Sequence, residues 1–193
     1  MGGAVIGAEA FLRGSPLEGK PAVRGFSDDD RALLDEVGET IIPTTATPGA
    51  KATGIGAFMI TMVNDCYDQP HHAAFQAGLL EINRAAMRQF GTSFPAAAPE
   101  ERTELLNALD AEQRAQHEQK TPEEPEHYFR LMKQLAVLGY FTSEIGASQA
   151  LRYVETPGAY KSEPYQKGDR AWYVPAGTPG SYGDVAEGGK KPI

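Results

Sequence analysis

The sequence has a single cysteine, no dense cluster of basic residues and no long apolar run. One thiol, Cys66, excludes an intrachain disulfide, a metal site built from several thiolates, and the two-cysteine attachment of a c-type haem to this chain. The 18 Lys and Arg residues are outnumbered by 26 Asp and Glu residues, and no basic run is longer than Lys190 and Lys191. Nucleic-acid binding depends on clustered positive charge and is therefore not expected. No stretch reaches the roughly 20 apolar residues that span a bilayer, so no membrane span is expected.

Catalytic motifs are also scarce. The run that begins at Gly54 and Gly56 starts like a dinucleotide-binding loop, but the third glycine is missing and no strand precedes it. We interpret it as a helix start softened by glycine. Cys66 belongs to an apolar helical stretch, where a lone thiol behaves as a small buried hydrophobe. No Gly-x-Ser-x-Gly elbow supports a serine nucleophile.

The histidines do not form a convincing metal site. His71 and His72 are adjacent, and neighbours on a helix point about 100° apart. Glu124 and His127 match one copy of a helix motif that di-iron sites need twice, together with two more glutamates. We interpret these histidines as solvated polar residues. The chain is thus predicted to have no catalytic, cofactor-binding or metal-ligating residue of its own.

Hydrophobic periodicity predicts an all-α fold, a compact bundle of about five or six helices. The clearest signal is the apolar series Phe75, Leu79, Ile82, Ala86 and Phe90. No convincing strand pair is found, and Gly139 is a candidate interruption of the fifth helix. Thr142 is expected to cap the sixth helix. The expected helices cover residues 28–42, 54–68, 70–90, 99–111, 125–139 and 142–154.

Composition divides the chain into three parts. Residues 1–25 combine a small, apolar start with a linker rich in Pro and Gly, and residues 26–154 form the helical domain. Residues 155–193 contain 12 Gly or Pro residues, which predicts an extended arm, yet five aromatics lie among them. Disordered tails are usually poor in aromatics. We expect these side chains to anchor the arm on a surface, either of the helical domain or of a partner.

Two blocks of the sequence resemble the gluconate 2-dehydrogenase subunit 3 family. The first is LLDEVGETIIPTTATPGAKATGIGAFM at residues 33–59, with the core ETIIPTT and TPGAKA. The second is GYFTSEIGASQALRYVETPGAYKSEPY at residues 139–165. Both blocks occur in the family's order, and the resemblance covers residues 27–170.

The resemblance implies a non-catalytic small subunit of an FAD-dependent sugar or sugar-acid dehydrogenase, with glucoside 3-dehydrogenase subunits especially similar. FAD is then carried by a larger catalytic partner related to the glucose-methanol-choline oxidoreductases. A c-type cytochrome, with its haem, often receives the electrons in such complexes. The family typically enters the periplasm through a twin-arginine signal. Residues 2–10, which end in the A-x-A pattern of Ala8 and Ala10, would then be the remnant of that signal; otherwise they are a flexible start.

A subunit that carries a partner needs a binding surface. The candidate surfaces are the loop at residues 43–53 and the arm at residues 157–182, although the aromatics of the arm can equally pack on the chain's own helices. Two other classes stay open: a free-standing periplasmic helical module that binds a small ligand, and an independent enzyme that uses Cys66 or the histidines. The predicted partner-binding residues are Pro43, Thr44, Thr45, Pro48, Tyr160, Tyr165, Arg170, Trp172 and Tyr173.

Overall fold

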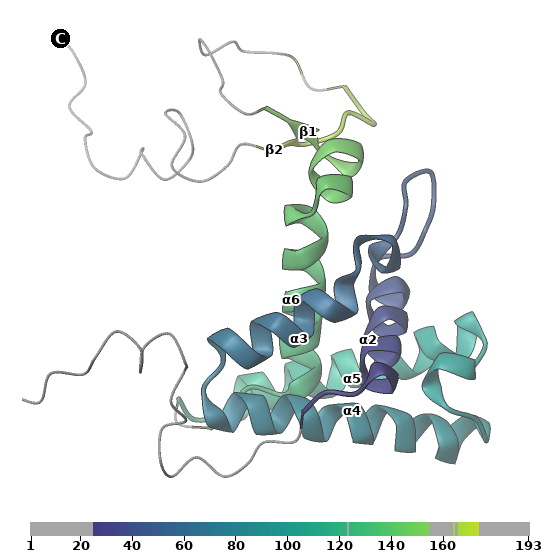
Figure 1. The fold of residues 1–193 in the computed structure, drawn as a ribbon, viewed down its shortest axis with the longest axis vertical. Helices are drawn as coiled ribbons and strands as arrows, with labels where there is room; N and C mark the ends of the chain where they lie inside the picture. Colours follow the sequence, from purple (N-terminus) through teal and green to yellow (C-terminus); the bar gives the residue numbers. More distant parts are fainter. Residues whose placement is uncertain (1–24, 123, 155–163, 165, 174–193) are drawn as a thin grey trace, which may run out of the picture.

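The computed structural model describes residues 25–122, 124–154, 164 and 166–173. Within these residues the chain is all-α, as predicted. Figure 1 shows α4 (Gln69–Phe90) along the base of the molecule and α6 (Tyr128–Thr142) rising from it towards the short strands β1 (Arg152–Tyr153) and β2 (Trp172–Tyr173). None of the helices in this described part is long and apolar enough to cross a membrane. The α-helices are α2 (Asp28–Ile41), α3 (Ile55–Cys66), α4 (Gln69–Phe90), α5 (Pro99–Gln119) and α6 (Tyr128–Thr142).

The helices begin and end where local chemistry favours it. At the start of α2 the Ser27 hydroxyl accepts a hydrogen bond from the Asp30 amide (3.1 Å), and the Asp30 carboxylate accepts one from the Ser27 amide (2.8 Å). This reciprocal pair satisfies amides that the helix itself leaves unpaired. Gly91 ends α4 in the left-handed region, with φ of 72°, and Gly54 takes φ of 69° just before α3. The interpretation of Gly54 as part of a helix start is confirmed.

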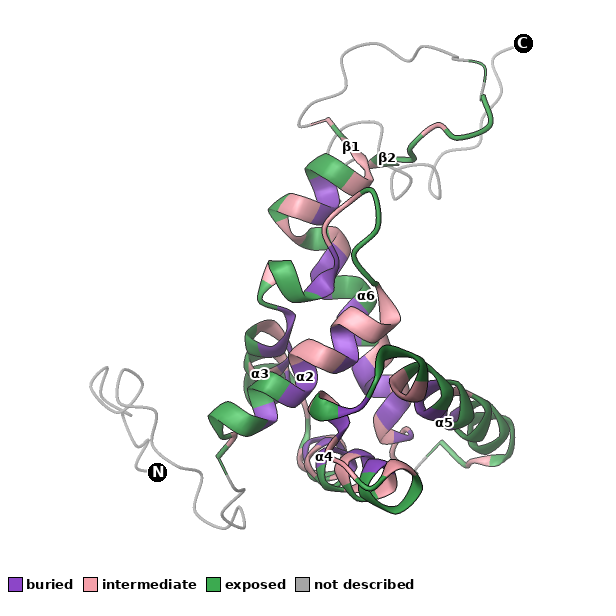
Figure 2. Cartoon of the chain, turned by 90° about the vertical axis from the view of Figure 1, so that its right-hand side faces the viewer, coloured by how far each residue is buried: buried purple, intermediate pink, exposed green. Residues whose placement is uncertain are grey.

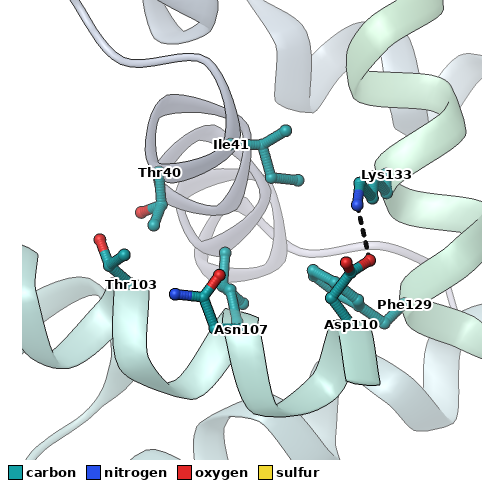
Figure 3. Close-up of a pocket in the computed structure, with 8 residues that line it drawn as sticks. Thr40, Ile41, Thr103, Asn107, Asp110, Phe129 and Lys133 are labelled. Atoms are coloured by element: carbon teal, nitrogen blue, oxygen red, sulfur yellow. Dashed lines mark hydrogen bonds and ion pairs between the residues drawn. The ribbon is translucent and has the colours of Figure 1, made fainter. Parts of the chain in front are cut away.

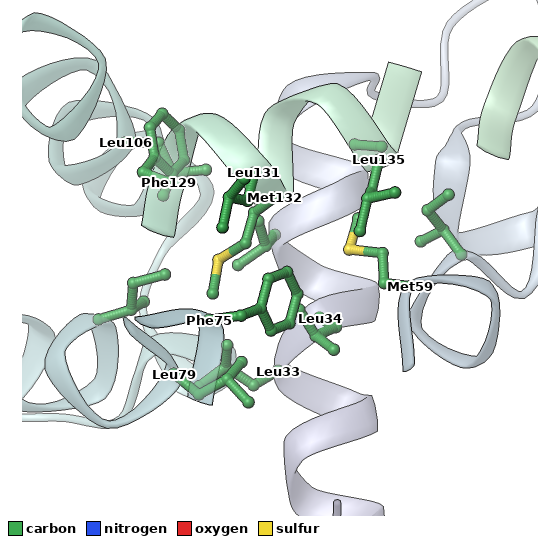
Figure 4. Close-up of a cluster of buried hydrophobic side chains, with 14 of the residues drawn as sticks. Leu33, Leu34, Met59, Phe75, Leu79, Leu106, Phe129, Leu131, Met132 and Leu135 are labelled. Carbon is green, nitrogen blue, oxygen red and sulfur yellow. The ribbon is translucent and has the colours of Figure 1, made fainter. Parts of the chain in front are cut away.

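The core lies where α2, α3, α4 and α6 meet. Figure 4 shows Phe75 of α4 pointing into the centre, with Leu34 of α2 and Met132 of α6 beside it. Figure 2 shows the buried residues on the inward faces of the helices, while α5 is exposed along much of its length. Burying such side chains is the main favourable contribution to folding. The largest fully buried apolar side chains include Phe75, Phe94, Leu34, Ile55, Met59, Ile82 and Met132.

The last two helices and the end of α5 differ most from the prediction. Helix α5 does not end near residue 111 but continues to Gln119, and Gln113 in this added part is only 4% exposed. Helix α6 is not interrupted at Gly139; a Cβ there would meet Ile55 and Phe58, so this glycine lets α3 pack closely. The expected sixth helix is shorter: it contains the π-helical turn η3 (Gly146–Ala150) and is capped by Ser143 instead of Thr142.

The expectation of no strand pair is wrong. Strand β1 (Arg152–Tyr153) pairs in parallel with β2 (Trp172–Tyr173). The Arg152 amide donates to Ala171 O (2.8 Å), and the Arg152 side chain forms an ion pair with Asp169 (2.9 Å). Strands of two residues are too short to show any sequence periodicity. Most of the proposed arm and residues 1–24 lie outside the described residues, so the three-part division stays a prediction.

Phe75→Ala should lower the free energy of unfolding by about 3–5 kcal/mol, because it leaves a cavity in the centre of the core. Leu80→Ala on the same helix should change it by less than about 0.5 kcal/mol, because Leu80 is 50% exposed. Urea unfolding followed by circular dichroism would measure both. Equal effects of the two substitutions would show that the core is not centred on Phe75.

Candidate functional site

The first family-like block forms an organised loop at the end of α2. This signature loop, residues 42–53, rises beside the upper part of α6 and ends in the short helix η1 (Ala50–Thr53) (Figure 1). The Ala50 amide donates to Ile42 O (2.9 Å), which closes the loop at its base, and the Thr45 amide donates to Thr47 O (2.9 Å) near its tip. The loop therefore has a defined backbone conformation while its tip is exposed.

Glu39 of α2 holds the signature loop from below. Its Oε1 accepts hydrogen bonds from the Thr44 amide (2.8 Å) and the Thr44 hydroxyl (2.7 Å), and its Oε2 accepts one from the Lys51 amide (3.0 Å). The backbone at Gly49 passes so close that a Cβ there would lie 2.3 Å from Glu39 Oε2. A larger residue at that position would displace the Glu39 carboxylate from the three hydrogen bonds by which it holds the loop.

Tyr140 of α6 holds the same loop from the side. Its ring is buried, at 2% exposure, and its hydroxyl donates to Pro48 O (2.8 Å). Pro48 belongs to the first family-like block and Tyr140 to the second, 92 residues further along the chain. The two blocks thus meet at one hydrogen bond.

A second carboxylate of α2 adds an ionic tie. The Glu36 carboxylate accepts hydrogen bonds from the Lys51 ammonium of η1 and the Arg102 guanidinium of α5. Burial raises the pKa of Glu36, but the hydrogen bonds and charges of Lys51 and Arg102 lower it by more. The net pKa of Glu36 therefore lies below the ordinary value of 4.5. Glu36 connects α2, the signature loop and α5 through charge.

Four of the predicted partner-binding residues lie in the signature loop. Pro43, Thr44 and Thr45 are exposed at the loop, whereas Pro48 is half-buried against Tyr140. Their proposed role in partner binding stays a prediction.

The described part of the arm is fastened to the helical domain. The Arg170 guanidinium donates to Ser148 O (3.1 Å) and Gln149 O (2.7 Å), at the end of η3. Tyr173 stacks on Tyr153 with ring centroids 5.9 Å apart. Trp172 is 55% exposed and remains accessible. Tyr160 and Tyr165 lie outside the described residues.

The whole segment that contains the loop and core matches a known family. The sequence model described as gluconate 2-dehydrogenase subunit 3 matches residues 28–158. The chain belongs to the gluconate 2-dehydrogenase subunit 3 family. No curated protein and no solved structure gives a significant match. Family membership indicates a small subunit of a dehydrogenase complex, and it confirms the resemblance drawn from the two sequence blocks.

Two interpretations of possible reactive residues were wrong. Cys66 is not buried but exposed at the end of α3. His72 and His127 are not solvated; each is 8% exposed. The His127 ring accepts a hydrogen bond from the Phe129 amide (3.1 Å) and caps α6, and burial lowers its pKa despite the opposing charge of Glu112. In this family member the described residues contain no group of three or more His, Cys, Asp or Glu side chains placed to hold a metal ion.

A small pocket lies between α2, α5 and α6 (Figure 3). Its volume is about 160 Å³, below the range of about 300–1,000 Å³ typical of small-molecule sites. Thr40 and Thr103 donate their hydroxyls to carbonyls of their own helices (2.7 and 2.8 Å), and Lys133 donates to Asp110 (2.6 Å). We therefore interpret this pocket as a seam between helices. It is lined by Thr40, Ile41, Thr103, Leu106, Asn107, Asp110, Phe129 and Lys133.

Sequence reasoning missed the residues that hold the signature loop. Glu36, Glu39 and Lys51 lie inside the first block but had no role assigned from pattern. Arg102 lies 66 residues from Glu36, so no local periodicity links the two. The role of Tyr140 could not be inferred from the sequence either, because its partner is a backbone carbonyl.

Glu39→Gln should release the signature loop. An amide has one acceptor oxygen in place of two and brings an NH₂ group against the donors of Thr44 and Lys51, so the free energy of unfolding should fall by about 1–3 kcal/mol. Hydrogen exchange of the Thr44 and Lys51 amides should accelerate. Exchange of the amides in α4 should accelerate only as far as the lower free energy of global unfolding requires. Glu144→Gln, at an exposed position in the described structure, is the matched control and should change neither quantity.

Glu36→Gln should have a pH-dependent cost. Because the folded-state pKa of Glu36 is lowered, the carboxylate stabilises the fold above pH 4.5, and this contribution disappears as the pH falls through the folded-state pKa. We expect a loss of about 2 kcal/mol at pH 7 that shrinks as the pH falls through this lowered pKa. Chemical denaturation at several pH values would measure it. A penalty that is constant across this range would contradict the ionic role of Glu36.

Proposed function

We propose that the chain is the non-catalytic small subunit of a periplasmic, FAD-dependent sugar dehydrogenase of the glycoside or gluconate type. Its role is to bind, stabilise and help export the flavoprotein catalytic subunit. The observation that carries this proposal is the construction of the signature loop. The carboxylate of Glu39 is engaged in three hydrogen bonds that hold the loop backbone, and the side chains at its tip face outward. The signature loop therefore provides an exposed surface for a partner, held in place by hydrogen bonds to its backbone.

The catalytic chemistry is assigned to the partner. FAD belongs to a larger subunit of the glucose-methanol-choline type, and a c-type cytochrome is proposed as electron acceptor in a third subunit. The exported complex would follow the twin-arginine route. On the small subunit, the loop residues Pro43, Thr44 and Thr45 and the exposed ring of Trp172 are the proposed contacts, because aromatic rings and well-fixed loops contribute strongly to interfaces.

Co-expression tests the proposal directly. The tagged chain, produced together with the genes encoded beside its own, should elute as a complex with a larger protein that shows the absorption spectrum of oxidised flavin. The catalytic subunit expressed alone should be less soluble, because the surface that the small subunit covers is then exposed. A colourless, folded chain that captures no flavoprotein would contradict the proposal.

If the chain were a free-standing binding module, a small ligand should raise the melting temperature of the isolated chain. A panel of sugars and sugar acids, scanned by differential fluorimetry without the partner, separates that alternative from the subunit. We expect no shift with any of them.

A further inference from the structure

A groove between α5 and α6 contains apolar side chains that are exposed in the described part of the structure. Val137 and Leu138 of α6 are 42% and 46% exposed. They line a depression of about 570 Å³ on the described surface. Exposed apolar side chains gathered in a concave site mark interaction surfaces more often than scattered ones do. The remaining lining residues are Gln113, Arg114, Arg130, Lys133 and Gln134.

The rim of the α5–α6 groove is basic in a chain whose net charge is −8. Three of its lining residues, Arg114, Arg130 and Lys133, are cations, and none is an acid. The Asp110 carboxylate beside the groove is shared by Arg114 and Lys133, at 2.6 Å from each. One negative charge thus faces two positive ones, Arg130 pairs with Glu126 (3.5 Å), and the Arg114 side chain is still 68% exposed, so three cations face two carboxylates. The rim retains positive charge that an acidic partner would complement.

The groove favours a helix over an extended segment. All of its lining residues lie within α5 and α6, and, apart from the amide of Arg130 in the first turn of α6, their backbone amides and carbonyls are used inside those helices. An extended peptide would find at most this one backbone partner there and would lose hydrogen bonds on burial. A helix satisfies its own backbone and can place apolar side chains at positions i, i+3 and i+4 into the groove.

We propose that the α5–α6 groove receives an amphipathic helix of the flavoprotein catalytic subunit, with an apolar stripe on Val137 and Leu138 and flanking Asp or Glu side chains on the basic rim. This assignment rests on the proposed function, since family membership supplies the dehydrogenase partner. It adds a surface that the sequence did not single out. The groove and the signature loop share α6, because Tyr140, which holds the loop, lies one turn beyond Val137.

The test compares two exposed apolar pairs on different helices. The double variant Val137→Ser/Leu138→Ser alters the groove, and Leu80→Ser/Met87→Ser alters α4, where the two side chains are 50% and 52% exposed. Binding of each purified variant to the flavoprotein subunit is measured by titration calorimetry at two salt concentrations. Circular dichroism and melting curves check that both variants keep the wild-type fold, as expected for exposed positions.

The groove pair should weaken binding by about tenfold or more, while the α4 pair should leave it within about twofold. Arg114→Gln should weaken binding by about threefold and reduce its salt dependence, since it removes a charge at the rim.

The other outcomes overturn the inference in distinguishable ways. Wild-type binding that the groove variants leave unchanged would overturn the groove assignment and leave the subunit role intact. A groove variant that only dissociates a homodimer would assign the groove to a second copy of this chain. A wild-type chain that binds no flavoprotein would overturn the proposed function and the groove assignment together.

Discussion

Two carboxylates at the C-terminal end of α2 impose the constraint on which the signature loop depends. Glu36 and Glu39 lie three residues apart, so they share one side of the helix, and the last turn of α2 contains no basic residue. Negative charge at a helix C-terminus is unfavourable because it meets the negative end of the helix dipole. The favourable state therefore needs donors from elsewhere. The chain supplies them by folding the signature loop over Glu39 and by bringing Arg102 of α5 to Glu36.

The same constraint explains why the loop has a defined conformation although most of it is not regular secondary structure. Glu39 binds amides on both arms of the loop, so the arms cannot separate without leaving a partly buried carboxylate short of donors. Gly49 is needed where the backbone crosses that carboxylate. Tyr140 then fixes the loop against α6 through the Pro48 carbonyl. Loop, α2, α5 and α6 are thus joined by polar contacts above the apolar core.

Local signals in the sequence were sufficient for most of the helical framework. Ser27, Gly91 and Pro99 mark helix ends by chemistry that acts within one turn, and the apolar series of α4 gives its buried face. The features that were predicted wrongly depend on contacts between residues far apart in the sequence. Gln113 in the added part of α5 is buried and accepts a hydrogen bond from Arg130 of α6, and the glycine at position 139 accommodates the close approach of α3. The β1–β2 pair joins residues twenty apart through two-residue strands that carry no pattern. At the site, the family-like blocks located the loop, but neither block indicated that Glu39 and Tyr140 hold it.

The way in which these contacts converge on α6 bears on how such a subunit would bind. Its upper end holds the signature loop through Tyr140 and continues into η3, whose carbonyls receive Arg170 of the arm. Its middle carries Val137 and Leu138 in the α5–α6 groove. Binding is normally opposed by the entropy that is lost when flexible segments become ordered. Here the loop and the described part of the arm are already held by intramolecular hydrogen bonds, so a partner would meet surfaces that are ordered in advance. Less of the contact energy is then spent on ordering these segments, which suits a chain whose proposed contribution to a dehydrogenase complex is binding.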